Sequence, residues 1–176
     1  MVDVPRTVAE IDWQTWKPSE FATLCFVIRD GQMLLIRKKR GLGAGKIVAP
    51  GGRLEPGETP RVCAIREVQE ELCVTPTGVV ARGQHCFQFL DGYAIRVFAF
   101  SAEDCEGVPR ETDEAIPAWT PLDAIPYPQM WQDNRLWLPL LLEGVPFSGR
   151  YVFDDDTLLD HAIEQRFDPA LAETTP

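Results

Sequence analysis

The sequence predicts an α/β fold in which a mixed sheet lies between helices. Two stretches rich in β-branched and aliphatic residues turn back at Asp30-Gly31 and at Asp91-Gly92. The Asp-Gly dipeptide favours a tight hairpin turn. Two other stretches, residues 59–72 and about 132–142, are predicted helices. Hairpins flanked by helices are typical of a sheet that is covered by helices.

The predicted strands lie on both sides of a glycine-rich loop. The first hairpin is expected within residues 21–39, and the sequence GLGAGKIVAPGG, residues 41–52, predicts a loop. The second hairpin is expected within residues 84–102, where alternation places His85, Phe87 and Phe89 on one side. The sequence RYVFDDD, residues 150–156, predicts the last strand.

The first predicted helix covers residues 59–72. Thr59 is a suitable N-cap, and Pro60 suits the first helical turn, where its missing N–H is no loss. An apolar stripe on one face is expected to be buried, while the glutamates occupy another face. The stripe consists of Val62, Ile65, Val68, Gln69 and Leu72.

The length and charge of the chain limit its function. A chain of 176 residues with 45% hydrophobic residues fits one domain with a sizeable core. Its net charge of -10 argues against binding a nucleic-acid polymer, so a phosphate partner is expected to be small and accompanied by metal. No long apolar run or signal peptide is evident, so a cytoplasmic location without membrane contact is expected. The five cysteines, without CxxC spacing, suggest neither a disulfide framework nor a zinc site.

The sequence REVQEELC, residues 66–73, places three glutamates on one side of the predicted helix. Glu67 and Glu71 are a like-charge i, i+4 pair, which destabilises a helix by about 0.2 to 0.5 kcal/mol. One interpretation is a solvated acidic face. The other is a site for a hard divalent cation, which prefers oxygen ligands and removes the repulsion between them.

The residues upstream of these glutamates complete a longer motif. Gly52 is followed after five residues by Glu58, and after seven more by Arg66-Glu67-Val68-Gln69-Glu70-Glu71. This spacing resembles the Nudix box of the MutT/Nudix hydrolases. The resemblance implies a loop, helix and loop on an α/β/α sandwich with a mixed central sheet. It also implies binding of Mg²⁺, with Mn²⁺ as a substitute, and hydrolysis of a nucleoside diphosphate linked to another group.

The chemistry of such a reaction gives each residue of the motif a role. A polyphosphate repels an attacking water, so cations must bridge the phosphates and neutralise the developing charge. Glu67, Glu70 and Glu71 are therefore the expected metal face, and Glu67 or Glu71 also orients or deprotonates the water. The resemblance adds the carbonyl of Gly51 as a metal ligand. Arg66 and Glu58 are expected to form an ion pair that attaches the loop to the helix.

Cys73 is a departure from the motif, which has glycine at this position. Glycine would let the chain leave the helix through a left-handed conformation without steric cost. With Cys73 the helix ends differently or accepts mild strain, and we expect no loss of catalysis.

The segments KKRGLGAGK, ETDEAIPAW and MWQDNRLWLPLLL resemble the MutT-homologue branch that hydrolyses oxidised purine nucleoside triphosphates. The resemblance covers residues 21–165, the expected catalytic domain. It implies that Glu111 is a further metal ligand, although an ordinary surface acid is the alternative. It also implies a stacking aromatic residue beside base-reading polar groups and pocket-lining positions. These are Trp131, Gln132, Asp133, Asn134, Thr23 and Lys38, and Phe87 lines the cavity or serves only for packing.

Two positions of the base pocket differ from that branch. Val48 replaces an asparagine, and Asn134 replaces a second aspartate. A pocket that hydrogen-bonds its ligand discriminates by as much as about 10⁴-fold more than an apolar one. Val48 makes no such side-chain bond, and Asn134 does not change protonation state. The sequence therefore predicts triphosphate hydrolysis more firmly than specificity for oxidised guanine.

The expected function is a Mg²⁺-dependent pyrophosphohydrolase that converts a purine nucleoside triphosphate, such as 8-oxo-dGTP or 2-hydroxy-dATP, to monophosphate and pyrophosphate. We expect a monomer. One alternative is a Nudix hydrolase of a nucleotide sugar, a dinucleoside polyphosphate or a capped nucleotide. The other is a Nudix-fold module that binds nucleotides without turnover. Residues 1–20 are an expected extension that docks through Trp13 and Trp16, and residues 166–176 are an expected polar tail.

Overall fold

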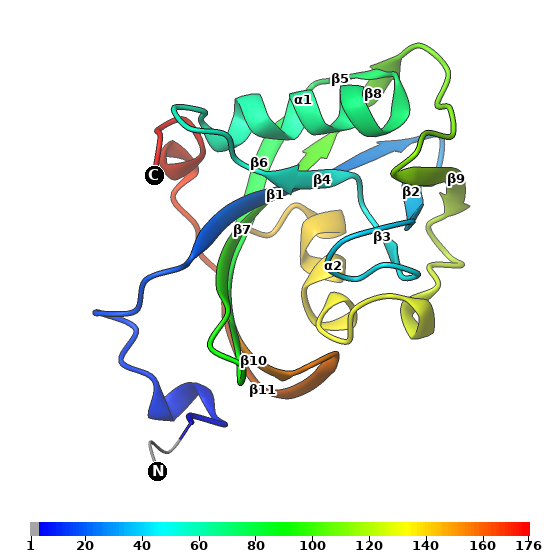
Figure 1. The fold of residues 1–176 in the computed structure, drawn as a ribbon. Coiled ribbons are helices and arrows are strands. Elements are labelled where there is room, and N and C mark those ends of the chain that lie inside the picture. The colour runs from blue at the N-terminus through cyan, green and yellow to red at the C-terminus, as the bar shows by residue number, and fades with distance from the viewer. Residues whose placement is uncertain (1–3) are drawn as a thin grey trace.

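The computed structural model describes residues 4–176, so residues 1–3 of the predicted extension lie outside the described part (Figure 1). The main sheet consists of β1 (Glu20–Arg29), β2 (Gln32–Lys38), β3 (Ile47–Val48), β4 (Gly51–Arg53), β6 (Val80–Phe89), β7 (Ala94–Ala102), β9 (Ala115–Pro121), β10 (Phe147–Asp154) and β11 (Thr157–Glu164). A separate pair consists of β5 (Thr75–Thr77) and β8 (Asp104–Glu106). The helices are α1 (Pro60–Leu72), α2 (Asn134–Glu143) and the 3₁₀ turns η1 (Val8–Glu10), η2 (Tyr127–Gln129) and η3 (Pro169–Ala172).

The main sheet is mixed, as predicted. Its strand order is β11-β10-β6-β7-β1-β2-β3, with β4 paired to β1 and β9 paired to β2. The pairs β1–β7 and β6–β10 are parallel, whereas the two predicted hairpins, β1–β2 and β6–β7, are antiparallel. Asp30 and Gly31 have φ values of 51° and 71°, which fit a tight hairpin turn. Both hairpins are therefore confirmed.

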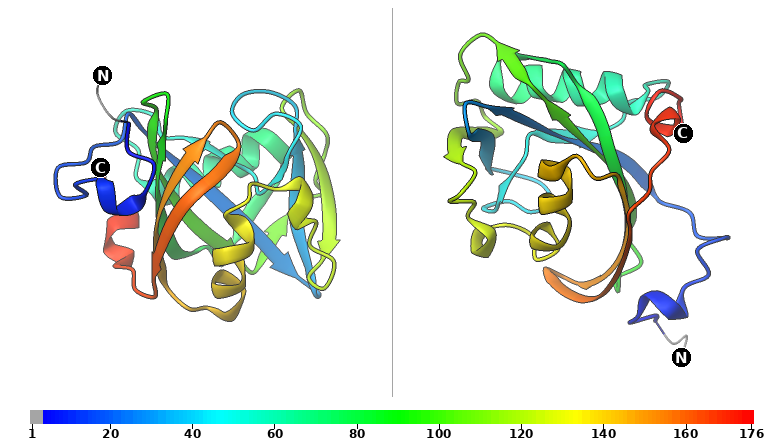
Figure 2. Two further views of the ribbon diagram at one scale, coloured as in Figure 1. Left: turned by 90° about the horizontal axis from the view of Figure 1, so that it is seen from below. Right: turned by 180° about the vertical axis from the view of Figure 1, so that it is seen from behind.

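Each face of the sheet has its own core, and each core includes one helix (Figures 1 and 2). Successive residues of β1 alternate between the two cores because side chains of a strand point to opposite faces. Phe26 packs in the core of α2, which contains Trp137. Cys25 and Val27 pack in the core of α1. The predicted α/β/α arrangement is confirmed.

Two strand predictions were incomplete. Part of the expected loop 41–52 forms β3 and β4, and β11 follows the strand that we expected to be the last. Gly51 of β4 pairs with Leu24 of β1, and a Cβ atom on Gly51 would lie 1.9 Å from the carbonyl oxygen of Thr23. Here glycine permits close pairing of strands instead of a flexible loop.

Helix α1 has the predicted start but a different buried face. The hydroxyl of Thr59 accepts a hydrogen bond from the amide of Val62, as an N-cap does. The predicted apolar stripe was wrong in part, because the Val62 side chain is 53% exposed and Gln69 is exposed. The helix is rotated so that it buries small and apolar residues together with one carboxylate. They are Pro60, Cys63, Ala64, Val68, Glu71 and Leu72.

The two ends of the described chain contact the domain. Trp13 and Trp16 do not lie in a regular helix, but their ring centroids are 5.4 Å apart. The indole N–H of Trp16 donates to Gln88 Oε1 in β6 at 2.9 Å. In η3, Ala172 is fully buried in the core of α1. Within residues 4–176, no helix is long and apolar enough to cross a membrane.

Cys73 ends α1 in the left-handed conformation, with φ 60° and ψ 29°. A non-glycine residue in this conformation costs about 1 to 2 kcal/mol, and the extra freedom of glycine in the unfolded chain offsets about 0.5 to 1 kcal/mol. Replacing Cys73 with glycine should therefore raise the free energy of unfolding by about 0.5 to 1 kcal/mol in urea titrations. Cys73→Ala keeps the strained backbone and is the control. If Cys73→Gly is no more stable than Cys73→Ala, the left-handed conformation at residue 73 does not strain the backbone.

Candidate active site

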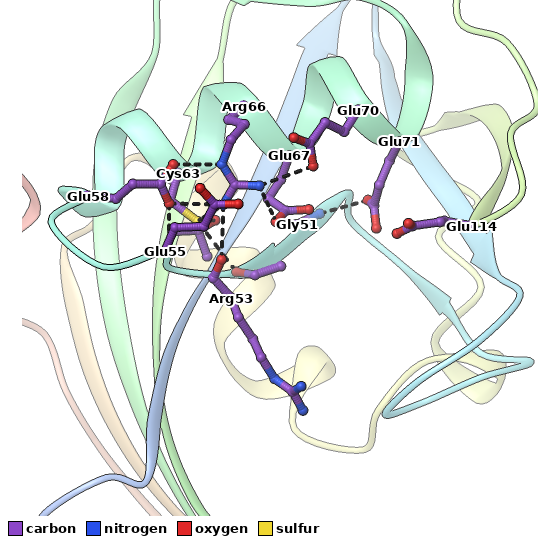
Figure 3. Close-up of polar contacts among 12 residues, drawn as sticks. Gly51, Arg53, Glu55, Glu58, Cys63, Arg66, Glu67, Glu70, Glu71 and Glu114 are labelled. Atoms are coloured by element: carbon purple, nitrogen blue, oxygen red, sulfur yellow. Dashed lines mark hydrogen bonds and ion pairs between the residues drawn. The ribbon is translucent and has the colours of Figure 1, made fainter.

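Arg66 on α1 joins the helix to the loop that follows β4 (Figure 3). Its guanidinium binds Glu58 in a bidentate manner, with Nε–Oε1 and Nη2–Oε2 distances of 2.6 and 2.9 Å. The same Nη2 donates to the carbonyl oxygen of Arg53 at 3.0 Å. The amide of Glu55 donates to Glu58 at 2.8 Å and closes the loop around this pair. These bonds fix the distance between β4 and the first half of α1.

Glu67 and Glu70 extend from α1 beside Arg66 (Figure 3). Arg66 Nη1 lies 2.8 Å from Glu67 Oε1 and 3.1 Å from Glu70 Oε2. Glu67 is half-buried, and this burial raises the pKa of its carboxyl group. A Cβ atom on Gly52 would lie 2.4 Å from Glu67 Cδ, so glycine at this position leaves room for the carboxylate where it lies. Glu70 is 58% exposed and faces solvent.

Glu71 is the most buried of the three helical glutamates. Only 3% of the residue is exposed, and the Gly51 amide donates to its Oε2 at 3.0 Å. Burial raises the pKa of Glu71 to about 7, and the nearby charge of Glu67 contributes in the same direction. The acidic face is therefore partly buried against β4 and is not a solvated surface.

A fourth carboxylate, Glu114, lies beside Glu71 (Figure 3). Its charge contributes to the raised pKa values of Glu67 and Glu71. Glu111, the acid that the resemblance indicated, lies outside the cavity wall and binds Lys39 Nζ at 2.6 Å. Sequence reasoning missed Glu114. The available signal was its position directly before strand β9, whose pairing with β2 brings it to the site.

The donor set fits a hard divalent cation. Four carboxylates with oxygen donors lie near one side of the cavity, and such groups are the preferred ligands of Mg²⁺. Within residues 4–176, however, no three acidic side chains converge closely enough to hold an ion as they stand. Arg66 holds Glu67 and Glu70, while Gly51 holds Glu71. Arg40 pairs with Glu114, so each of the four carboxylates already has an ion-pair or hydrogen-bond partner.

The carboxylates line the same cavity as most of the predicted base-binding residues. The cavity has a volume of about 750 Å³. Gln132 is not part of the cavity wall. The Oε1 atom of Gln132 instead accepts a hydrogen bond from the Leu158 amide at 2.8 Å. The predicted residues in the wall are Gly51, Arg66, Glu67, Glu70, Glu71, Thr23, Lys38, Val48, Phe87, Trp131, Asp133 and Asn134.

Sequence reasoning missed a cluster at the rim of the cavity. Arg53 and Tyr93 both line the wall, and Glu20 at the start of β1 binds both. Arg53 Nε lies 2.8 Å from Glu20 Oε2, and the Tyr93 hydroxyl donates to the same oxygen at 2.5 Å. No sequence motif predicts this cluster, because Glu20 begins β1, Arg53 ends β4 and Tyr93 lies in the turn between β6 and β7.

Asp133 provides a hydrogen-bond acceptor at the base-binding end of the cavity. Its Oδ2 accepts a hydrogen bond from the Trp137 indole N–H at 2.6 Å. Its Oδ1 is buried and has no hydrogen-bond partner among the described residues. Burial raises the pKa of Asp133 to about 6. Because Asp133 lines the cavity, the free acceptor suits an N–H or amino group of a ligand.

Comparisons with known proteins agree with this geometry. Residues 18–141 match the NUDIX domain family. The chain is 38% identical to the oxidized purine nucleoside triphosphate hydrolase of Danio rerio and 36% identical to that of Mus musculus, over 84% of this chain and 96% of each relative. The crystal structure of a MutT protein from Bacillus halodurans has a TM-score of 0.74 at 26% identity, over 84% of this chain and 99% of that chain. The resemblance that the motif indicated is confirmed.

The buried carboxyl group of Asp133 should make stability depend on pH. Its folded pKa of about 6 lies above its ordinary value of 3.8, so the folded state binds more protons between these values. Stability should therefore fall as pH rises from about 4 to about 6, by about 2 to 3 kcal/mol relative to Asp133→Asn. Asparagine keeps an acceptor for Trp137 and does not titrate. Urea unfolding of both proteins at pH 4 and pH 7 measures the difference, and a constant difference would contradict the assigned burial.

Proposed function

This chain belongs to the NUDIX family, and on that basis we propose that it is a divalent-cation-dependent pyrophosphohydrolase of purine nucleoside triphosphates. The proposed substrates include oxidised forms such as 8-oxo-dGTP and 2-hydroxy-dATP, and the proposed products are the monophosphate and pyrophosphate. The observation that carries the proposal is the single cavity that joins the carboxylates of α1 to the aromatic and acidic groups around Trp131. One nucleotide can reach both ends.

At one end of the cavity, the side chains suit a purine. The indole of Trp131 offers a face for stacking, and the free Oδ1 of Asp133 accepts a hydrogen bond from the edge of the base. Asn134 adds an amide, whereas Val48 adds only apolar contact. This combination supports recognition of a purine, with one acidic group instead of two adjacent ones.

At the other end, the carboxylates suit a triphosphate with its cation. Glu67, Glu70, Glu71 and Glu114 would hold the cation, proposed to be Mg²⁺, which neutralises phosphate charge and polarises the anhydride when bound. Glu67 or Glu71 accepts the proton of the attacking water. Arg66 keeps α1 and β4 at a fixed distance, so the carboxylates stay aligned during the reaction. Lys38 and Arg53 in the cavity wall provide positive charge for the phosphates.

The relatives from Danio rerio and Mus musculus, named for hydrolysis of oxidized purine nucleoside triphosphates, support this substrate class. The net charge of -10 supports a small nucleotide over a nucleic-acid polymer. We also propose that residues 21–165 form the catalytic domain and that the protein acts as a cytoplasmic monomer.

The acidic residues allow a direct test of the proposed catalytic side. Replacing Glu71 with glutamine removes a charge needed to hold the cation, so kcat should fall by about 10²-fold or more in Mg²⁺. Pyrophosphate release from a purine nucleoside triphosphate measures this change, and circular dichroism checks that the fold is intact. Full turnover in folded Glu71→Gln would exclude this carboxylate from catalysis.

Glu114 and Glu111 form a matched pair, because they lie three positions apart and only Glu114 lines the cavity. Glu114→Gln should lower kcat by about tenfold or more, since it removes a carboxylate from the cation site. Glu111→Gln loses only the exposed ion pair with Lys39, worth at most about 1 kcal/mol, so its kcat should stay near that of the unmodified enzyme. If Glu111→Gln lowers kcat more than Glu114→Gln does, Glu111 and not Glu114 is the cation ligand.

A further inference from the structure

The ring of Trp131 has a cation over it, supplied by Lys46. The ammonium group of Lys46 lies 4.9 Å from the centroid of the Trp131 ring, within the range of a cation–π contact. Trp131 lines the cavity, but Lys46 lies outside its wall. The indole therefore lines the cavity and also contacts a cation that is not part of the cavity wall.

Lys46 is itself held in place by neighbouring segments. Its side chain is 24% exposed, and Nζ lies 3.4 Å from Asp156 Oδ2 in the turn between β10 and β11. Its carbonyl oxygen accepts a hydrogen bond from the Lys38 amide at 3.0 Å. Its amide donates to the carbonyl oxygen of Gly43 at 2.9 Å. Loop 39–46 and the β10–β11 turn thus meet at Lys46.

The backbone of the same loop packs directly against the indole. A Cβ atom on Gly43 would lie 2.8 Å from Nε1 of Trp131, closer than real Cβ contacts. Phe153 and Phe89, which also line the cavity, meet the indole edge to face, with centroid distances of 5.6 and 6.3 Å. Trp131 is therefore held from several directions while one side remains open to the cavity.

We propose that Lys46 and Gly43 are positioning residues that hold Trp131 in the orientation that stacks on the purine. This inference rests on the proposed function, because it takes Trp131 as the residue that contacts the base. A ring that is already fixed loses little conformational freedom when the base binds, so its contacts contribute more fully to affinity. The two residues act on binding of the base and not on the carboxylates, so they should change KM and leave kcat nearly unchanged.

Two glycines of the loop provide a matched comparison. Gly43 and Gly45 both have positive φ values, 79° and 88°, so alanine is strained at either position. Among the described residues, a Cβ atom on Gly45 would meet no heavy atom within 4 Å. Gly43→Ala should raise KM for a purine nucleoside triphosphate by about tenfold, because the methyl group displaces Trp131. Gly45→Ala carries the backbone strain alone and should leave KM within about twofold.

Lys46 is tested by removing and restoring its charge. Lys46→Met keeps an unbranched side chain but removes the cation, so KM should rise about threefold with little change in kcat. Lys46→Arg restores a cation over the ring and should return KM close to its original value. Thermal unfolding by circular dichroism checks that all variants are folded. A purely structural role of Lys46 would not produce this separation of KM from kcat or this rescue.

Trp131→Ala separates failure of the inference from failure of the proposed function. Trp131→Ala raises KM if the base site is correct. If the KM of Gly43→Ala then equals that of Gly45→Ala, and the KM of Lys46→Met equals that of Lys46→Arg, the positioning role is wrong and the base site stands. If Trp131→Ala leaves KM unchanged, the proposed base site is wrong and the positioning role fails with it. The inference is supported if KM rises in three variants, Trp131→Ala, Gly43→Ala and Lys46→Met, and does not rise in Gly45→Ala or Lys46→Arg.

Discussion

The contacts of Arg66 organise the acidic side of the cavity. One guanidinium group binds Glu58 in the loop, Glu67 and Glu70 on α1, and the backbone carbonyl of Arg53 in β4. Without this cation, neighbouring carboxylates on one side of a short helix would repel each other and destabilise the helix where it packs on the sheet. Arg66 therefore allows an acidic helix to pack closely on β4 before any metal binds. It also fixes the separation of α1 and β4, and therefore the position of the glutamates relative to the backbone of Gly51.

The two glycines of β4 leave room for neighbours on two different elements. Gly51 leaves room for the backbone of β1, and Gly52 leaves room for the carboxylate of Glu67. The amide of Gly51 then compensates the buried Glu71 with one hydrogen bond. Burial, with the charges of nearby carboxylates, raises the pKa values of Glu67 and Glu71, and a divalent cation would offset the repulsion between these charges. At the far end of the same cavity, aromatic rings from β6 and β10 and the residues before α2 form an apolar wall suited to a base.

The sequence predicted the parts of this molecule that short-range patterns determine. Asp-Gly turns identified both hairpins, and Thr59 with Pro60 identified the start of α1. The spacing from Gly52 to Glu71 identified the family. The sequence did not reveal which side of α1 is buried, because the buried face includes the carboxylate of Glu71, whose partner is the Gly51 amide on a different element. Strand pairing, rather than local sequence, brings Glu114 instead of Glu111 to the cavity. The support of Trp131 by Lys46 likewise depends on contacts between segments that are distant in the chain.

In the proposed reaction, one cavity binds the base of a purine nucleoside triphosphate at one end and its phosphates at the other, and water attacks at the bond whose cleavage releases pyrophosphate. The most direct measurement is product analysis by ion-exchange chromatography after incubation with ordinary and oxidised purine nucleoside triphosphates in Mg²⁺. We expect nucleoside monophosphate and pyrophosphate in equal amounts, and we expect chelation of the cation to abolish turnover. Release of nucleoside diphosphate and orthophosphate would contradict it, as would tight nucleotide binding without turnover.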